Sequence, residues 1–274
     1  MTASPKAGDK AAGSLAAGAV AVLCAADPEE KRRRSDAAAA AWRGGRIEVG
    51  RTTTPDRPAR PARPELRPPR EMPRRRAATT RASRIALLHA LAHIELNAVD
   101  LAWDIIARFA HEDLPRAFYD DWVGVAAEEA RHFGLLSGRL AALGAAYGDL
   151  PAHDGLWEAA EATADDLLAQ LAVVPLVLEA RGLDVTPAMI ARLRAAGDDD
   201  SAAVLEVIYR DEIGHVAVGR RWFEYLCARR GLRPETTYHA LVRARFKGAL
   251  KPPFNVAARD AAGFDTAYYA PLAR

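Results

Sequence analysis

The chain has 274 residues, of which half are hydrophobic and 27% are charged, and its formal net charge at pH 7 is +2. This length can bury a large core, and the small net charge argues against a protein that binds nucleic acid with its whole surface. Two cysteines far apart in the sequence, Cys24 and Cys227, exclude a disulfide framework and a cysteine-based zinc site. They fit a reducing compartment, and we expect a cytoplasmic protein.

Residues 1–45 are rich in alanine and predict one or two peripheral helices. Their apolar stretch, residues 11–26, follows two lysines and superficially resembles the core of a signal peptide. However, it leads directly into "DPEEKRRRSDAAAAAW", where Asp27 and Pro28 are typical of a helix start. We therefore expect no cleaved signal. The apolar run 167–180 is too short to cross a bilayer, so no membrane segment is predicted.

Residues 46–80 are rich in proline and arginine, which predicts an extended arm rather than a helix. Between residues 51 and 84, eleven arginines stand against three acidic residues, a local balance of +8. Two interpretations are open: contact with RNA or another polyanion, or an arm packed over an acidic helical body. We favour the second, because the arm lacks the aromatic residues that single-strand binders place between their basic ones.

From residue 81 to 248 the pattern is helical, and a loop-rich, aromatic tail at 249–274 is expected to pack over one end of the helices. Long helices are predicted at 81–110, 115–143, 155–182 and 199–230, and a short one at 186–196. Pro175 should kink the third long helix and free a carbonyl group. The sequence thus predicts an all-α protein whose four-helix bundle follows N-terminal helices and the arm.

Each of the four long helices carries a glutamate near the centre of the apolar stripe that should face the core. The first and third contribute a single glutamate, and the second and fourth a glutamate followed three residues later by a histidine: Glu95, Glu129, His132, Glu179, Glu212 and His215. The glutamates of the two helix pairs are separated by 34 and 33 residues, which indicates a duplicated helix pair.

A single buried glutamate or histidine is usually a structural group, and a glutamate often reaches solvent. Six such groups at matched depths are a different case, because each unpaired buried carboxylate costs several kcal/mol against a total stability of roughly 5–15 kcal/mol. Two metal ions would neutralise the carboxylates and bind their lone pairs. Four glutamates and two histidines form the ligand set of a di-iron or iron–manganese site.

The motifs "EEARH" (128–132) and "DEIGH" (211–215), with "HIELNAVDLAWD" and "LEARGLD", resemble the ferritin-like di-iron carboxylate superfamily. The longer stretches "RIALLHALAHIELNAVDLAWD", "YDDWVGVAAEEARHF", "PAHDGLWEAA" and "RDEIGHVAVGRRWF" resemble its uncharacterised family DUF455. The resemblance covers most of the chain, including the arm. It implies a ferritin-like four-helix bundle with the N-terminal segment as part of the folded protein.

The superfamily resemblance also implies a role for the acidic residue that precedes each Glu-x-x-His motif. Asp211 would orient His132, and Glu128 would orient His215, each from the opposite helix. A ligating imidazole needs an acceptor for its second N–H group, which agrees with this assignment. The alternative for Glu128 is a side chain that points into solvent.

Such a site implies two metal ions, Fe/Fe or Fe/Mn, in an oxygen-dependent oxidoreductase of hydroxylase or oxidase type that acts on a small molecule and takes electrons from a donor. The alternative is an iron-binding, ferroxidase or storage protein without an organic substrate. A similarity to di-iron tRNA hydroxylases, together with the arm, makes RNA modification a minor alternative. The sequence assigns no separate catalytic residue, electron donor or oligomeric state, and predicts no membrane partner.

Several residues near the predicted site have weaker functional interpretations. Tyr209, one turn before Glu212, is expected to be a core residue rather than a redox-active tyrosine. His89 and His93 are interpreted as structural histidines or partners of nearby acids. The large apolar residues expected to line the site are Trp103, Phe109, Trp122 and Trp222.

Overall fold

The structure is a computed structural model that describes residues 13–72 and 79–273, and every regular element within these ranges is a helix. The elements before the first long helix are α1 (Leu15–Leu23), α2 (Pro28–Arg43) and the short η1 (Pro69–Glu71). The elements that follow are α3 (Arg81–Arg108), α4 (Arg116–Ala142), α5 (Gly155–Glu161), α6 (Leu167–Val173), η2 (Val174–Glu179), α7 (Ala180–Ala195), α8 (Asp199–Arg229), α9 (Pro234–Arg245), α10 (Val256–Ala261), α11 (Thr266–Tyr269) and η3 (Ala270–Leu272). The predicted all-α class is confirmed.

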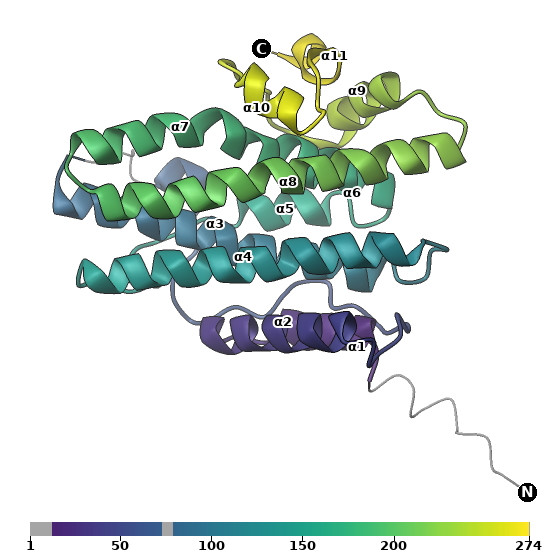
Figure 1. The fold of residues 1–274 in the computed structure, drawn as a ribbon, viewed down its shortest axis with the longest axis horizontal. Helices are drawn as coiled ribbons and strands as arrows, with labels where there is room; N and C mark the ends of the chain where they lie inside the picture. The colour runs from purple at the N-terminus through teal and green to yellow at the C-terminus, as the bar shows by residue number, and fades with distance from the viewer. Residues whose placement is uncertain (1–12, 73–78, 274) are drawn as a thin grey trace, which may run out of the picture.

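The long helices lie side by side in layers (Figure 1). Helix α3 packs along α4, α7 packs along α8, and α4 and α8 also contact each other. Helices α1 and α2 cover α3 and α4 on one side, and α9 to α11 lie on the opposite side of the molecule, against α6, α7 and α8. The aligned centres of α3, α4, η2 and α8 are therefore the part of the fold that can bring distant polar residues together.

Local sequence explains where the first helices begin. The Asp27 carboxylate accepts a hydrogen bond from the Glu30 amide at 2.8 Å, and Pro28 occupies the first turn of α2, as predicted. Thr80 and Ser83 form a reciprocal capping pair at the start of α3. The apolar stretch before Asp27 forms α1, and its residues Leu15, Val22 and Leu23 are fully buried.

The prediction for the third long helix is wrong at two places. Helix α5 ends at Glu161, where the Thr163 hydroxyl donates to the Ala160 carbonyl, and a new helix begins at Leu167 with Asp166 as its cap. The chain then stays helical through Ala195, although the sequence predicts a break between the helices 155–182 and 186–196. Pro187 lies inside α7. It is tolerated there because the Leu183 carbonyl, which loses its helical donor, accepts from the Asn255 side chain at 3.0 Å.

The predicted distortion at Pro175 takes the form of a π-helical segment, η2, which ends at Glu179. Proline has no amide hydrogen and its ring disturbs the preceding turn, so a wider turn relieves the strain. The ring packs against α8 at Gly219, where an added Cβ would collide with it. This close approach fixes η2 against α8.

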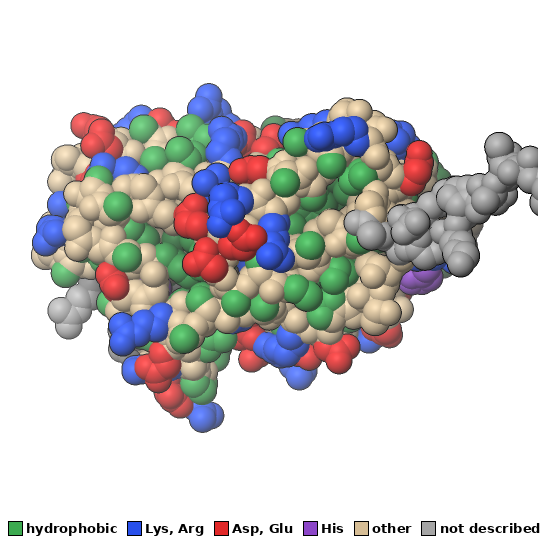
Figure 2. All heavy atoms as spheres, turned by 90° about the horizontal axis from the view of Figure 1, so that it is seen from below, with side chains coloured by type: hydrophobic (Ala, Val, Ile, Leu, Met, Phe, Trp, Pro, Cys, Tyr) green, Lys and Arg blue, Asp and Glu red, His purple; other side chains and the backbone are tan. Residues whose placement is uncertain are grey.

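The described part of the arm, residues 46–72, contains no α-helix and runs over the helical body. Arg57 pairs with Asp154 and Glu161, and Arg60 pairs with Asp100 of α3. The Ala59 amide donates to the Leu23 carbonyl at 2.8 Å. Figure 2 shows acidic and basic side chains interspersed on the face that carries α1 and α2, without a broad area of one sign. Arm residues 73–78 lie outside the described residues.

Helix α3 is long and apolar enough to cross a membrane by length and composition, but 72% of its most apolar window is buried inside the protein. Such burial is typical of the core helix of a bundle, which passes the same test.

Candidate metal centre

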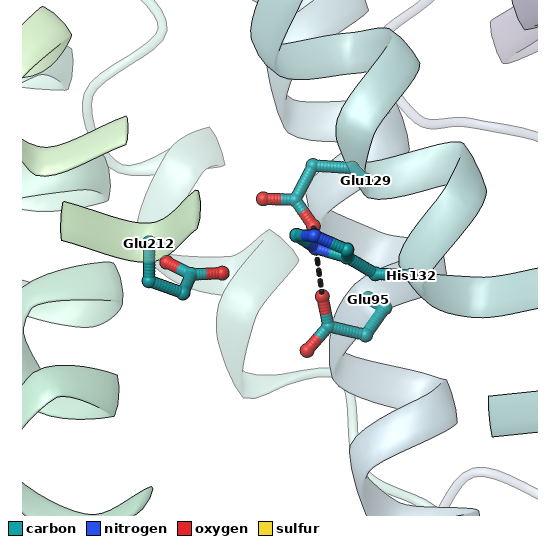
Figure 3. Close-up of side chains that lie close together, drawn as sticks. All are labelled: Glu95, Glu129, His132 and Glu212. Carbon is teal, nitrogen blue, oxygen red and sulfur yellow. Dashed lines mark ion pairs between the residues drawn. The ribbon is translucent and has the colours of Figure 1, made fainter. Parts of the chain in front are cut away.

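Carboxylates and an imidazole from different helices meet at the centre of the bundle (Figure 3). Glu95 comes from α3, Glu129 and His132 from α4, and Glu212 from α8; one ligand-type atom of each lies within 4.8 Å of the others. Glu129 and His132 are fully buried, and Glu95 is 5% exposed. The structure therefore joins four of the six residues that the sequence predicted as ligands into one compact group.

His132 faces this group with one ring nitrogen and an acid on α8 with the other. Its Nδ1 lies 3.3 Å from Glu95 Oε2 and 3.5 Å from Glu129 Oε2. Its Nε2 lies 2.9 Å from Asp211 Oδ2, within hydrogen-bond distance. The acceptor on Nε2 favours a proton on that atom, so that in the neutral ring Nδ1 carries the lone pair and directs it at the carboxylates.

His215 repeats this geometry from the opposite helix. Its Nδ1 lies 2.9 Å from Glu129 Oε1 and 3.8 Å from Glu212 Oε1, while its Nε2 lies 2.8 Å from Glu128 Oε2. The centroids of the two imidazole rings are 5.7 Å apart. Thus Asp211 contacts His132 and Glu128 contacts His215, and Glu129 lies between the two imidazoles.

The fourth glutamate, Glu179, reaches the site from the last residue of η2. It is close enough for its carboxylate to repel those of Glu212 and Glu129. Neither Glu179 nor His215 belongs to the compact group of four. The six predicted residues therefore divide into this group and two further residues, one on η2 and one on α8.

The buried polar atoms of the site lack hydrogen-bond partners among the described residues. They are Glu95 Oε2, both carboxylate oxygens of Glu129, Glu179 Oε2, Glu212 Oε2, His132 Nδ1 and His215 Nδ1. The short distances from the Nδ1 atoms of His132 and His215 to the carboxylates are therefore not aligned as hydrogen bonds, whereas those from their Nε2 atoms are. Buried polar groups are almost always satisfied, and a group of unsatisfied lone pairs that converge on one space fits a bound cation.

Electrostatics within the cluster is dominated by burial and by mutual repulsion. Burial raises the pKa values of Glu95, Glu179 and Glu212, and neighbouring carboxylates raise them further. Burial also opposes ionisation of Glu129, but the adjacent imidazoles outweigh it and lower the pKa of that carboxyl.

The carboxylates raise the pKa values of both imidazoles. Burial opposes protonation of His132, but Glu129 and Glu95 outweigh it and raise its pKa to about 11. The pKa of His215 is likewise raised well above its usual value by Glu129 and Glu128, against the effect of burial. Without a cation the cluster compensates its negative charge with protons, which is how buried carboxylates avoid isolated charge.

The two acids behind the histidines are the most exposed parts of the site. The Glu128 side chain is 46% exposed and that of Asp211 is 24% exposed. Asp211 also forms an ion pair with Arg131, a half-exposed residue of α4. Arg32, Arg131 and Glu128 line an open groove of about 580 Å³ between α2 and α4. Solvent therefore reaches the outer partners of both histidines.

The residues with weaker functional interpretations make hydrogen bonds or apolar contacts that stabilise the fold. The Tyr209 hydroxyl accepts a hydrogen bond from Asn255 at 2.8 Å. His89 Nε2 accepts from the Gly148 amide at 2.9 Å, and His93 contacts the Tyr147 hydroxyl at 2.9 Å. The Trp103 indole donates to Ser35 on α2 at 2.8 Å, so its polar edge faces the N-terminal helices rather than the cluster. Phe109, Trp122 and Trp222 are buried in the same apolar core as Trp103.

His89 and His93, which the sequence marked as structural histidines, belong to a second polar stripe on α3 whose other members the sequence did not indicate. It consists of His89, His93, Asn97, Asp100 and Asp104, which follow one another at helical spacing on the face covered by the arm and the 147–154 loop. The spacing of these residues was the available signal. Arg60 of the arm pairs with Asp100, and Arg108 of α3 itself pairs with Asp104. Because Arg60 and Asp100 are 40 residues apart, the sequence did not identify this particular pair.

An all-helical fold with a buried glutamate and histidine cluster that can hold a metal ion defines the class of this protein. Comparison with known proteins adds the family: residues 24–270 match the family described as "Protein of unknown function (DUF455)", and the chain belongs to it. A relative from Haemophilus influenzae, with the name "Uncharacterized protein", is 43% identical over 209 residues, which cover 74% of this chain and 72% of the relative. No solved structure matches the chain.

Proposed function

We propose that the protein is a ferritin-like dinuclear metal carboxylate protein that acts as an oxygen-dependent oxidoreductase on a small molecule. One observation carries the proposal: both histidines turn Nδ1 toward a shared set of unpartnered carboxylate oxygens while carboxylates hold both Nε2 atoms. Imidazole and carboxylate ligands together suit iron and manganese. We therefore favour Fe/Fe or Fe/Mn as the metal pair.

In this proposal the ligands divide by position. Glu129, between the imidazoles, would bridge the two ions; His132 with Glu95, and His215 with Glu212, would each serve one ion. Glu179 would complete the set from η2. Asp211 and Glu128 would fix the orientation and basicity of the imidazoles by accepting their Nε2 hydrogens. A reduced metal pair of this kind supplies the ability to activate dioxygen when bound.

The protein's own contribution would be exclusion of water and positioning. Val99, Ala126 and Leu176 belong to the buried apolar core and lie one helical turn from Glu95, Glu129 and Glu179, so charged ligands there stay in a dry environment where their interactions are strong. The pairing of Arg57 and Arg60 with acids of the helical body supports a packing role for the arm over RNA modification.

Metal analysis of protein purified without chelator tests the proposal. We expect about two iron or manganese ions per chain, and a change in the absorption spectrum when the reduced protein meets oxygen. Glu129→Ala and Glu212→Ala should lose metal, whereas Glu224→Ala, on the same helix as Glu212 but paired with Arg220 outside the cluster, should retain it. Full metal content in the first two variants would refute the ligand assignment. Large particles with thousands of iron ions would favour storage instead.

A further inference from the structure

The helical segments around Glu179 contain two carbonyl groups that lack the amide donor of a regular α-helix, those of Leu176 and Leu183. At the end of η2 the Ala180 amide donates to the carbonyls of Pro175 and Val177, and so not to that of Leu176. Further on, Pro187 has no amide hydrogen for the carbonyl of Leu183. Both irregularities flank Glu179, within one to two turns of its backbone.

Donors for these carbonyls come from the C-terminal cap, which we define as residues 234–272. The Tyr238 hydroxyl of α9 donates to the Leu176 carbonyl at 3.1 Å, and Tyr238 is fully buried. The Asn255 side chain donates to the Leu183 carbonyl at 3.0 Å. Arg259 of α10 donates to the Ala180 carbonyl at 3.2 Å. Three cap residues therefore contact the backbone on both sides of Glu179.

The cap is itself rigidly held, so these donors are fixed in place. Arg259 is 2% exposed and bonds both carboxylate oxygens of Asp184, at 2.9 and 2.8 Å. Its guanidinium lies 4.4 Å from the ring centroid of Tyr269 and 5.0 Å from that of Phe254. Asn255 also bonds Tyr209, one turn before Glu212, so the cap contacts both helices that approach the cluster from this side.

We propose that the C-terminal cap positions Glu179 for metal binding, with Tyr238 as the principal positioning residue, an inference that rests on the proposed metal centre. A π-helical turn displaces the following side chain relative to a regular helix, and such turns are frequent at functional sites. Without the Tyr238 hydroxyl, the Leu176 carbonyl, which the Ala180 amide does not reach, would lose its side-chain donor. The loss of this hydrogen bond would favour a regular α-helical turn over the π-helical one. That change would move the Glu179 carboxylate.

The test uses cobalt(II), whose absorption reports ligand geometry, on the full-length protein. We expect wild type to bind two cobalt ions per chain, and Tyr238→Phe to bind one of them at least ten-fold more weakly. The spectrum of Tyr238→Phe should shift toward that of Glu179→Gln. The matched control is Tyr147→Phe, which removes a tyrosine hydroxyl that contacts His93 away from Glu179. It should lose a similar amount of thermal stability and keep both cobalt ions.

The outcomes separate the two proposals. If Tyr238→Phe binds both ions with wild-type affinity and spectrum, the positioning role is refuted and the metal centre stands. If wild type binds no cobalt, the metal centre is refuted and the positioning role with it. Should Tyr238→Phe not fold, Asn255→Ala provides the same comparison, because it removes the donor to Leu183.

Discussion

His132 Nε2 and Asp211 Oδ2 lie 2.9 Å apart across the interface between α4 and α8, and the same aspartate oxygen receives the guanidinium of Arg131. The aspartate thus connects a buried imidazole, with its other nitrogen directed at the carboxylate cluster, to the protein surface. An acceptor in this position fixes both the tautomer and the orientation of the ring.

Asp211→Asn should therefore weaken metal binding while it preserves the fold. Loss of such an outer acceptor typically costs about 10–100-fold in metal affinity. Asp121→Asn is the matched control, because Asp121 has similar exposure and also pairs with an arginine and a ring N–H, those of Arg221 and Trp222. Competition titrations with a chromophoric chelator measure both variants. Equal affinity in Asp211→Asn and Asp121→Asn would contradict the role of Asp211.

Lys31 should be one of the residues on which folding depends most. It is fully buried, pairs with the buried Asp100, and donates to the carbonyls of Val22 and Leu23 at the end of α1. Removal of one partner from a buried ion pair costs roughly 3–5 kcal/mol. Arg60 also pairs with Asp100, so Lys31→Met should lie at the low end of that range.

Chemical denaturation at neutral pH measures this cost. Arg33→Met is the control on the same helix, since Arg33 is 67% exposed and pairs only with Glu30. An exposed ion pair of this type contributes about 0–1 kcal/mol. A loss of less than about 1 kcal/mol in Lys31→Met would show that the buried pair does not hold the N-terminal helices to α3.

The glutamate and histidine seam could be predicted because one helix repeat determines which residues share a face, and the three-residue spacing within each motif needs no knowledge of the neighbouring helix. The irregular segments of the helices could not be predicted in this way. Helix α7 continues through Pro187 only because Asn255, 68 residues later in the chain, satisfies the Leu183 carbonyl. Likewise, Lys31 and Asp100 are 69 residues apart, and neither side chain alone indicates its partner.

Folding stability should depend on the protonation of His89. Its Nε2 accepts from the Gly148 amide, so the folded protein requires the neutral ring, and burial lowers its pKa below the usual value of 6.5. The unfolded chain then binds a proton more readily than the folded one. The stabilising contribution is present above about pH 6.5 and is lost as the pH falls through that value toward the lower folded pKa.

His89→Gln should flatten this dependence, because glutamine keeps an acceptor but does not titrate. Urea midpoints between pH 7 and pH 5 should fall less in this variant than in wild type. His111→Gln is the control, since His111 is exposed and its Nδ1 lies 3.0 Å from the Arg108 carbonyl; this variant should keep the wild-type dependence. A decline in His89→Gln as steep as in wild type would mean that other groups govern the acid response.

Metal removal should lower the thermal stability of the protein, because the unfolded chain cannot assemble ligands from four helical segments. At a free metal concentration one hundred times the dissociation constant, binding contributes about 2.7 kcal/mol. For a chain of this size that corresponds to a rise of roughly 5–10 °C in the unfolding midpoint.

Manganese(II) or cobalt(II) should produce the rise in chelator-treated protein, and magnesium should not, because it favours oxygen ligands over imidazole. Glu129→Ala should unfold at the same temperature with and without manganese, since in the proposed centre Glu129 would serve both ions. An equal rise in wild type and Glu129→Ala would place the stabilising metal outside the cluster.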